Sequence, residues 1–308
     1  MRLQKVEEGD GFFKALLIRF ISGVSGIRLP DAARIVMYHR SFYGKPMTTW
    51  THAAMRGESG WSVGERELFA AMTARWNECP FCVEAHGAIA SLVINKTMVA
   101  TALNDFRTAD LSTKLYATLQ FLEIFAKTPD VLTTEHLAGI LRSGASPRDL
   151  EDAMAVTALF SITARCANAF GFEMLNDADQ SRAAKRMLKQ GYVFGKGKPK
   201  GSPDHRAMAQ ELHRCIFEGP GITDTHLRQA VGRRATGGPA LPVPAYDRMA
   251  LEIGQSSYKI TDGQIKDVVS TAGSEKAAFE LIIAAAVAAG LFRWQRGLTL
   301  LKEVNVDS

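Results

Sequence analysis

Apolar residues recur at spacings of three and four along much of the chain, which is the pattern of helices that bury one face. No segment shows the strict alternation of apolar and polar residues that predicts a half-buried strand. The helical pattern runs through seven segments: 65–77, 81–95, 111–127, 149–170, 205–217, 244–256 and 275–302. Because such helices must bury their apolar faces against one another, the sequence predicts an all-α fold, a bundle of helices.

The segment GKGKPKGSPD, residues 195–204, divides the chain. It is rich in Gly, Lys and Pro and poor in core-forming residues, which is typical of a flexible linker. The 308 residues are 46% hydrophobic, enough to supply a core on each side of it. We therefore expect a helical extension over 1–34, a first domain over 35–194 and a second domain over 205–302, so that two helical units stand in tandem.

A weak internal repeat agrees with this division. Residues 133–171 resemble residues 260–298: each has a threonine and an acid before a short helix, a glycine stop, and then a long Ala-rich helix. An arginine, Arg165 or Arg293, lies well along each long helix. We expect the two halves to share an ancestor.

Composition limits the classes of partner. The net charge is +5, and much of the excess lies in 185–201, so nucleic-acid binding would depend on a linker and is not expected. The longest apolar run, 281–292, is shorter than the roughly 18 residues that cross a bilayer. The amino end has acidic residues ahead of its apolar part, unlike a secretory signal. We expect a cytoplasmic protein that binds no membrane.

Two cysteines and a histidine stand close together in RWNECPFCVEAHGAIA, residues 75–90. On a helix, Cys79, Cys82 and His86 share one stripe and can face a single pocket. Pro80 suits the first turn of a helix, so the helix should start near Cys79. The free amides and the dipole of that terminus favour a thiolate, the reactive form of cysteine.

An acidic residue precedes this cluster. Ser62 and Glu65 predict the capped start of a helix over SGWSVGERELFAAMTARWN, and Glu67 lies in its first turns. If this helix and the cysteine helix are antiparallel neighbours, Glu67 projects toward the same pocket. It can then share a proton with His86 or with a thiol, a contact that spacing alone leaves open.

Other functions of the cluster remain to be weighed. A structural zinc site needs a fourth ligand from an equally tight group, and none of the other histidines belongs to one. A c-type haem needs a histidine directly after the second cysteine, where this chain has Val83, so haem is excluded. Thiol chemistry, zinc and simple packing stay open. Cys166 is expected in the core, and Cys215 has no near partner.

The four residues Glu67, Cys79, Cys82 and His86, with eleven, two and three residues between them, resemble the signature of alkylhydroperoxidase D-like (AhpD-like) proteins, within the carboxymuconolactone decarboxylase superfamily. The similarity covers about 35–175. The second domain looks like a shorter, degenerate copy without the cysteine pair. In the well-known enzyme of the family a histidine stands before the second cysteine, where this chain has Phe81.

The resemblance implies an AhpD-like helical bundle and a thiol-dependent hydroperoxide reductase. It implies that Cys82 attacks the hydroperoxide and that Cys79 then forms a disulfide with it. His86 and Glu67 would relay protons, and an external dithiol or lipoyl-type reductant would restore the thiols. No cofactor and no metal are expected.

Two alternatives stand beside this function: a redox sensor or assembly protein that does not turn over substrate, and a carboxymuconolactone decarboxylase-like lyase. The paired thiols argue against the lyase, since such relatives are expected to work without them. The resemblance and the Ala-rich helical faces together lead us to expect a homo-oligomer, a trimer or a multiple of three.

Overall fold

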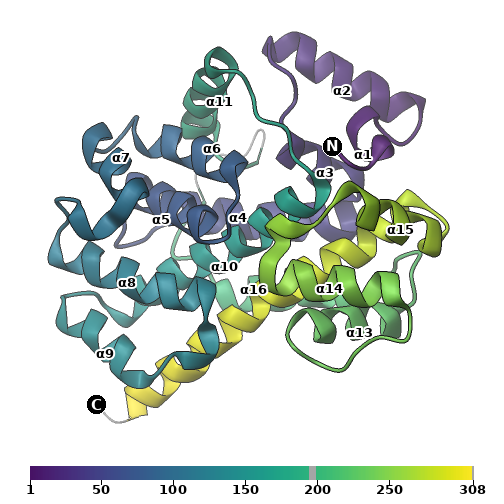
Figure 1. Ribbon diagram of the computed structural model, residues 1–308. Coiled ribbons are helices and arrows are strands. Elements are labelled where there is room, and N and C mark those ends of the chain that lie inside the picture. Colours follow the sequence, from purple (N-terminus) through teal and green to yellow (C-terminus); the bar gives the residue numbers. More distant parts are fainter. Residues whose placement is uncertain (194–198, 307–308) are drawn as a thin grey trace. The chain divides into compact units, whose positions relative to one another are not determined.

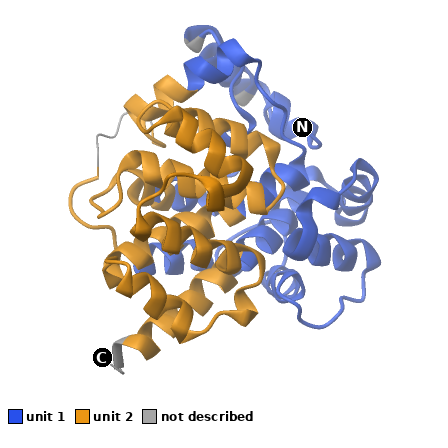
Figure 2. Ribbon diagram, turned by 60° about the vertical axis from the view of Figure 1, so that its left-hand side comes forward, with its two compact units in different colours: residues 1–49, 162–183, 206–289 blue, residues 50–161, 184–205, 290–308 orange. Residues whose placement is uncertain are grey.

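The computed structural model describes residues 1–193 and 199–306. Over these residues the chain forms sixteen α-helices, three short 3-10 turns and one π-helical turn, and no β-strand (Figure 1). The predicted all-α fold is confirmed. The helices gather into two compact units, which Figure 2 shows in blue and orange.

The orange unit comprises residues 50–161, 184–205 and 290–308 and carries the cysteine cluster. Its helices are most of α4 (Lys45–Arg56), α5 (Val63–Trp76), α6 (Pro80–Ala90), α7 (Lys96–Asp105), α8 (Thr113–Lys127), α9 (Thr134–Arg142), the first part of α10 (Pro147–Phe170), the second part of α11 (Asp177–Gln190) and the end of α16 (Glu275–Val306). Within it, α5 packs along α6 and against α8 (Figure 1).

The blue unit comprises residues 1–49, 162–183 and 206–289. Besides the remaining parts of α4, α10, α11 and α16, it contains α1 (Gln4–Glu8), α2 (Phe12–Ser25), α3 (Asp31–Tyr38), nearly all of α12 (His205–Phe217), α13 (Thr225–Ala235), α14 (Pro244–Ser256) and α15 (Asp262–Ala272). Within this unit α14 packs against both α13 and α15.

The compact units do not follow the predicted sequence ranges. Each unit draws on three separate stretches of chain, because the boundaries between the units fall within α4, α10, α11, α12 and α16. The domains 35–194 and 205–302 therefore stay a prediction about sequence segments. Of the predicted linker 195–204, residues 195–198 lie outside the described residues, and α12 begins at His205.

The predicted helices correspond to observed ones, with one clear difference. The segment 81–95 was expected as a single helix, but α6 ends at Ala90. Residues 91–94 instead form a turn, and the side chain of Ile94 packs directly on Gly64 of α5. The two are so close that a Cβ at position 64 would clash with Ile94. The apolar pattern continues past α6 because this turn is packed against α5. Asn95 then caps α7. In residues 91–94 the apolar pattern therefore reflects packing against α5 and not a helix.

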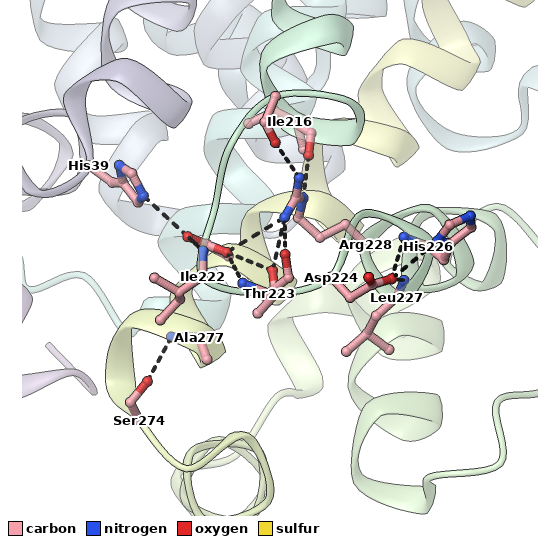
Figure 3. A network of polar contacts seen from close by, with 12 residues as sticks. His39, Ile216, Ile222, Thr223, Asp224, His226, Leu227, Arg228, Ser274 and Ala277 are labelled. Carbon is pink, nitrogen blue, oxygen red and sulfur yellow. Dashed lines mark hydrogen bonds and ion pairs between the residues drawn. The ribbon is translucent and has the colours of Figure 1, made fainter.

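A buried carboxylate organises the polar interior of the blue unit. Glu280, on α16, accepts hydrogen bonds from the backbone N–H groups of Ile222 and Thr223, both at 2.9 Å, and from the Thr223 hydroxyl at 2.6 Å. Nε2 of His39 lies 3.2 Å away, and Arg228 supplies a positive charge at 3.9 Å (Figure 3). Burial alone would raise the pKa of Glu280, but these donors outweigh it and lower the pKa to about 2.

One arginine arrangement occurs once in each unit. Arg66, on α5, donates to the carbonyls of Ala54 and Gly57, twelve and nine residues earlier. Arg228, on α13, donates to the carbonyls of Ile216 and Gly219, again twelve and nine residues earlier. Each arginine is buried, and its hydrogen bonds link its own helix to the end of the preceding helix. The helix pairs α4–α5 and α12–α13 thus repeat the same local contacts.

Two helices are long and apolar enough to cross a membrane, by length and composition only: Pro147–Phe170 and Glu275–Val304. In each, 89% of the apolar window is buried inside the protein. Burial of this degree is what the core helices of a folded domain show.

Replacing Glu280 by Gln should destabilise the fold by roughly 2–4 kcal/mol at neutral pH, because a buried arginine loses its counter-charge. Since folding lowers the pKa of Glu280 from 4.5 to about 2, its charge stabilises the protein above about pH 4.5. That contribution is lost as the pH falls from 4.5 toward 2, so the difference between wild type and Glu280→Gln should shrink over that range. Urea unfolding at several pH values measures it. The exposed Asp267→Asn on α15 is the control, and a difference independent of pH would contradict the account.

Candidate functional site

The cysteine helix begins at the residue that its sequence indicates. Cys79 is the N-cap of α6 in extended conformation, and Pro80 occupies the first helical position. The turn before it is tight: Glu78 has a φ of +50°, the one non-glycine residue with positive φ among the residues described. The Cys79 N–H donates to the carbonyl of Ala74 at 2.9 Å, which closes the end of α5 and fixes Cys79 against it.

The neighbouring helix α5 presents Glu67. Ser62 and Glu65 form the expected capping box at its start. Nearly every residue of α5 up to Ala74 is buried, so the helix runs through the interior of its unit. Glu67 consequently lies at 0% exposure, where an ionised carboxylate needs partners.

Those partners come from two other helices. Nδ1 of His86, on α6, lies 2.7 Å from Oε2 of Glu67, so the predicted contact between these residues is present. Nη2 of Arg56, at the end of α4, lies 2.8 Å from Oε1. The carbonyls of Met55 and Met187 hold the Arg56 guanidinium in place.

A fourth group completes the cluster from a distant part of the chain. The Tyr192 hydroxyl donates to both carboxylate oxygens of Glu67 at 3.1 Å and lies 3.4 Å from Nδ1 of His86. Its ring is parallel to the imidazole, with centroids 6.3 Å apart, and Phe160 of α10 packs edge-on against His86 at 4.4 Å. The Tyr192 N–H donates to Nδ1 of His52, which ties this segment to α4.

The electrostatics of the cluster favour an ionised Glu67. Burial raises the pKa of this carboxyl, but the hydrogen bond and charge of His86 and those of Arg56 outweigh burial and hold the pKa below its ordinary value. Burial and the Glu67 charge raise the pKa of Tyr192 well above its usual range, so the phenol stays protonated and donates. An ionised carboxylate only accepts, so Nδ1 of His86 carries its hydrogen and Nε2 is left as the basic nitrogen.

The two cysteines are thiols, and their side chains are almost completely enclosed, each at 1% exposure. Cys82 lies one helical turn before His86 on the same face of α6. Cys82 also lies within electrostatic reach of the cluster, because a negative charge on its sulfur would raise the pKa of Tyr192. Cys166 is buried in the core as predicted, and Cys215 contacts Glu211 on the surface of α12.

Of the predicted site residues Glu67, Cys79, Cys82 and His86, the structure brings Glu67 and His86 into contact. It adds two partners of Glu67 that the sequence did not indicate, Arg56 and Tyr192. Arg56 ends its helix eleven residues before Glu67, in a segment without a recognisable motif. Tyr192 is 125 residues from Glu67 and stands three residues before the Gly- and Lys-rich stretch whose composition predicts a linker. In the described part of the chain, no group of three or more His, Cys, Asp or Glu has the geometry to hold a metal ion.

Removing the carboxylate should be costly because it leaves the Arg56 guanidinium buried without its counter-charge. We expect Glu67→Ala to lower the free energy of unfolding by about 3–5 kcal/mol. Glu84→Ala, at an exposed position on α6, should change it by less than about 0.5 kcal/mol. Urea denaturation measures both, and equal small effects would contradict the described role of Glu67.

No protein-family model and no curated protein matches the chain. Among solved structures, the chain is similar to an uncharacterized peroxidase-related protein from Ralstonia eutropha JMP134, described as an alkylhydroperoxidase AhpD core, with 24% identity and a TM-score of 0.47 over 55% of this chain and 88% of that one. It is also similar to an uncharacterized peroxidase-related protein from Silicibacter sp. TM1040, with 22% identity and a TM-score of 0.48 over 55% and 87%. The first description names the family that the cysteine signature resembles.

Proposed function

We propose that the protein is a thiol-dependent hydroperoxide reductase that cycles Cys79 and Cys82 between dithiol and disulfide. The observation that carries this proposal is the buried contact of 2.7 Å between Glu67 of α5 and His86 of α6, because His86 shares a face of α6 with the enclosed Cys82 thiol. A thiol beside a carboxylate-oriented imidazole is the arrangement that activates a cysteine nucleophile.

In the first step, Cys82 gives its proton to Nε2 of His86, and the thiolate attacks the outer oxygen of the hydroperoxide. A sulfur–oxygen bond forms and the oxygen–oxygen bond breaks, which leaves a sulfenic acid on Cys82. His86 returns the proton to the departing alkoxide, so Cys82–SH and ROOH become Cys82–SOH and ROH. Glu67 keeps Nδ1 protonated and stabilises the imidazolium that forms in between.

In the second step, the Cys79 thiol displaces water from the sulfenic acid, and a disulfide joins Cys79 to Cys82. Enclosure of both side chains supports this order, because it limits the access of a second peroxide to the sulfenic acid. An external dithiol then reduces the disulfide by thiol exchange and is itself oxidised to a disulfide. We propose Cys82 as the attacked residue because the family resemblance implies it, and Cys82 is also closer than Cys79 to His86 along α6.

The Cys82→Ser variant should lose hydroperoxide consumption with dithiothreitol by roughly a thousandfold or more, because the nucleophile is gone. Cys215→Ser, outside the cluster, is the matched control and should keep the wild-type rate. Cys79→Ser should still react once and then stop at the sulfenic acid. An unchanged rate in Cys82→Ser would contradict the proposed function.

The His86→Ala variant should slow the first step by about 10²- to 10⁴-fold, the usual contribution of a general acid and base. The loss should be largest for an alkyl hydroperoxide with a poorly acidic leaving alcohol, which needs the returned proton most. Stopped-flow rates with excess enzyme isolate this step. Equal losses for all leaving groups would mean that His86 acts only on the thiol.

A further inference from the structure

Tyr192, like Arg56, belongs to the cluster but has no role assigned to it by the resemblance. It reaches the site from the segment after α11, on a turn at Gly191, which has a φ of +70°. A Cβ at Gly191 would lie 2.7 Å from Cε1 of His52, so the backbone passes α4 as closely as a glycine allows. The glycine turn therefore allows the Tyr192 hydroxyl to reach Glu67.

The three donors to Glu67 act on different parts of the carboxylate. Arg56 approaches Oε1 and His86 approaches Oε2, while the Tyr192 hydroxyl lies 3.1 Å from both oxygens and bridges them. A neutral donor that bridges both oxygens fixes the plane of the carboxylate and spreads its charge. A carboxylate that shares its charge in this way holds the imidazole and its proton less strongly.

We propose that Tyr192 is a positioning residue for the thiol reaction: by donating to both oxygens of Glu67, its hydroxyl orients His86 and limits how strongly the carboxylate stabilises the imidazolium, so that the proton taken from Cys82 can be passed on to the leaving group. The proposal rests on the proposed function for the identity of the reaction. It concerns thiol activation, however, which can be measured without any peroxide.

Several helices and one loop segment contribute charged or titratable groups near His86. Glu67 comes from α5, Arg56 and His52 from α4, Cys82 from α6, and Tyr192 from the segment after α11, while α10 contributes the apolar ring of Phe160. Arg66 adds a positive charge within reach of Arg56 and Glu67. Among these groups, Tyr192 alone can lose its hydroxyl and keep its ring, its stacking on His86 and its contact with the Arg56 guanidinium.

The test compares Tyr192→Phe with wild type in the full chain. The rate of alkylation of the thiols by iodoacetamide is followed against pH, with the alkylated cysteine identified by mass. Loss of one donor makes Glu67 stabilise the imidazolium more strongly, which favours the thiolate–imidazolium pair, so the pH of half-maximal Cys82 reactivity should fall by roughly half a unit to one unit. Tyr116→Phe is the matched control. It also removes a tyrosine hydroxyl that forms a hydrogen bond, here one accepted from the Gln120 side chain, but it lies outside the cluster.

The shift should vanish when Tyr192→Phe is made in a Glu67→Gln background, because the hydroxyl acts through the carboxylate. If Tyr192→Phe does not fold, difluorotyrosine at position 192 keeps the ring and strengthens the donor, and should move the profile to higher pH instead. An unchanged profile, or a shift of the wrong sign, overturns the proposal. Should wild type reduce no hydroperoxide, the proposed function fails while the alkylation profile still decides the role of Tyr192.

Discussion

The buried carboxylate of Glu67 is the interaction on which the cysteine-bearing unit depends. It lies at 0% exposure and accepts from Arg56 of α4, His86 of α6 and Tyr192 of the segment after α11. Taking such a charge out of water is costly unless every donor is in place, so the carboxylate selects one arrangement of these elements. The same contacts hold the imidazole of His86, which shares a face of α6 with Cys82, so under the proposed function stability and chemistry depend on one set of contacts.

Local sequence predicted much of this unit. Pro80 after Cys79 fixed the start of α6, and Ser62 with Glu65 fixed the start of α5, because both signals act within a single helical turn. Arg56 and Tyr192 could not be found in this way, since they meet Glu67 only through packing, and Tyr192 stands beside a segment whose composition indicates a linker. The turn over 91–94 was missed because Ile94 keeps the apolar pattern of a helix while it packs in a turn.

The blue unit contains a feature that supports the prediction of a degenerate second copy without the cysteine pair. Arg66 and Arg228 each donate to two backbone carbonyls, twelve and nine residues earlier in the sequence. The hydrogen bonds that link the two helices of each pair are therefore the same. The residue after each arginine differs: Glu67 in one pair and Gln229 in the other, where the amide donates to the carbonyl of Phe217. A neutral residue at this position needs no buried counter-charge, and no cysteine pair accompanies it.

The central claim is that a buried proton relay and two enclosed thiols form one redox site. Intact-mass measurement after one equivalent of hydroperoxide tests it most directly. The account predicts the loss of two hydrogens, mapped by digestion to a bond between Cys79 and Cys82, with Cys166 and Cys215 still free thiols. A protein that keeps all four thiols under these conditions, or that forms its disulfide elsewhere, would contradict it.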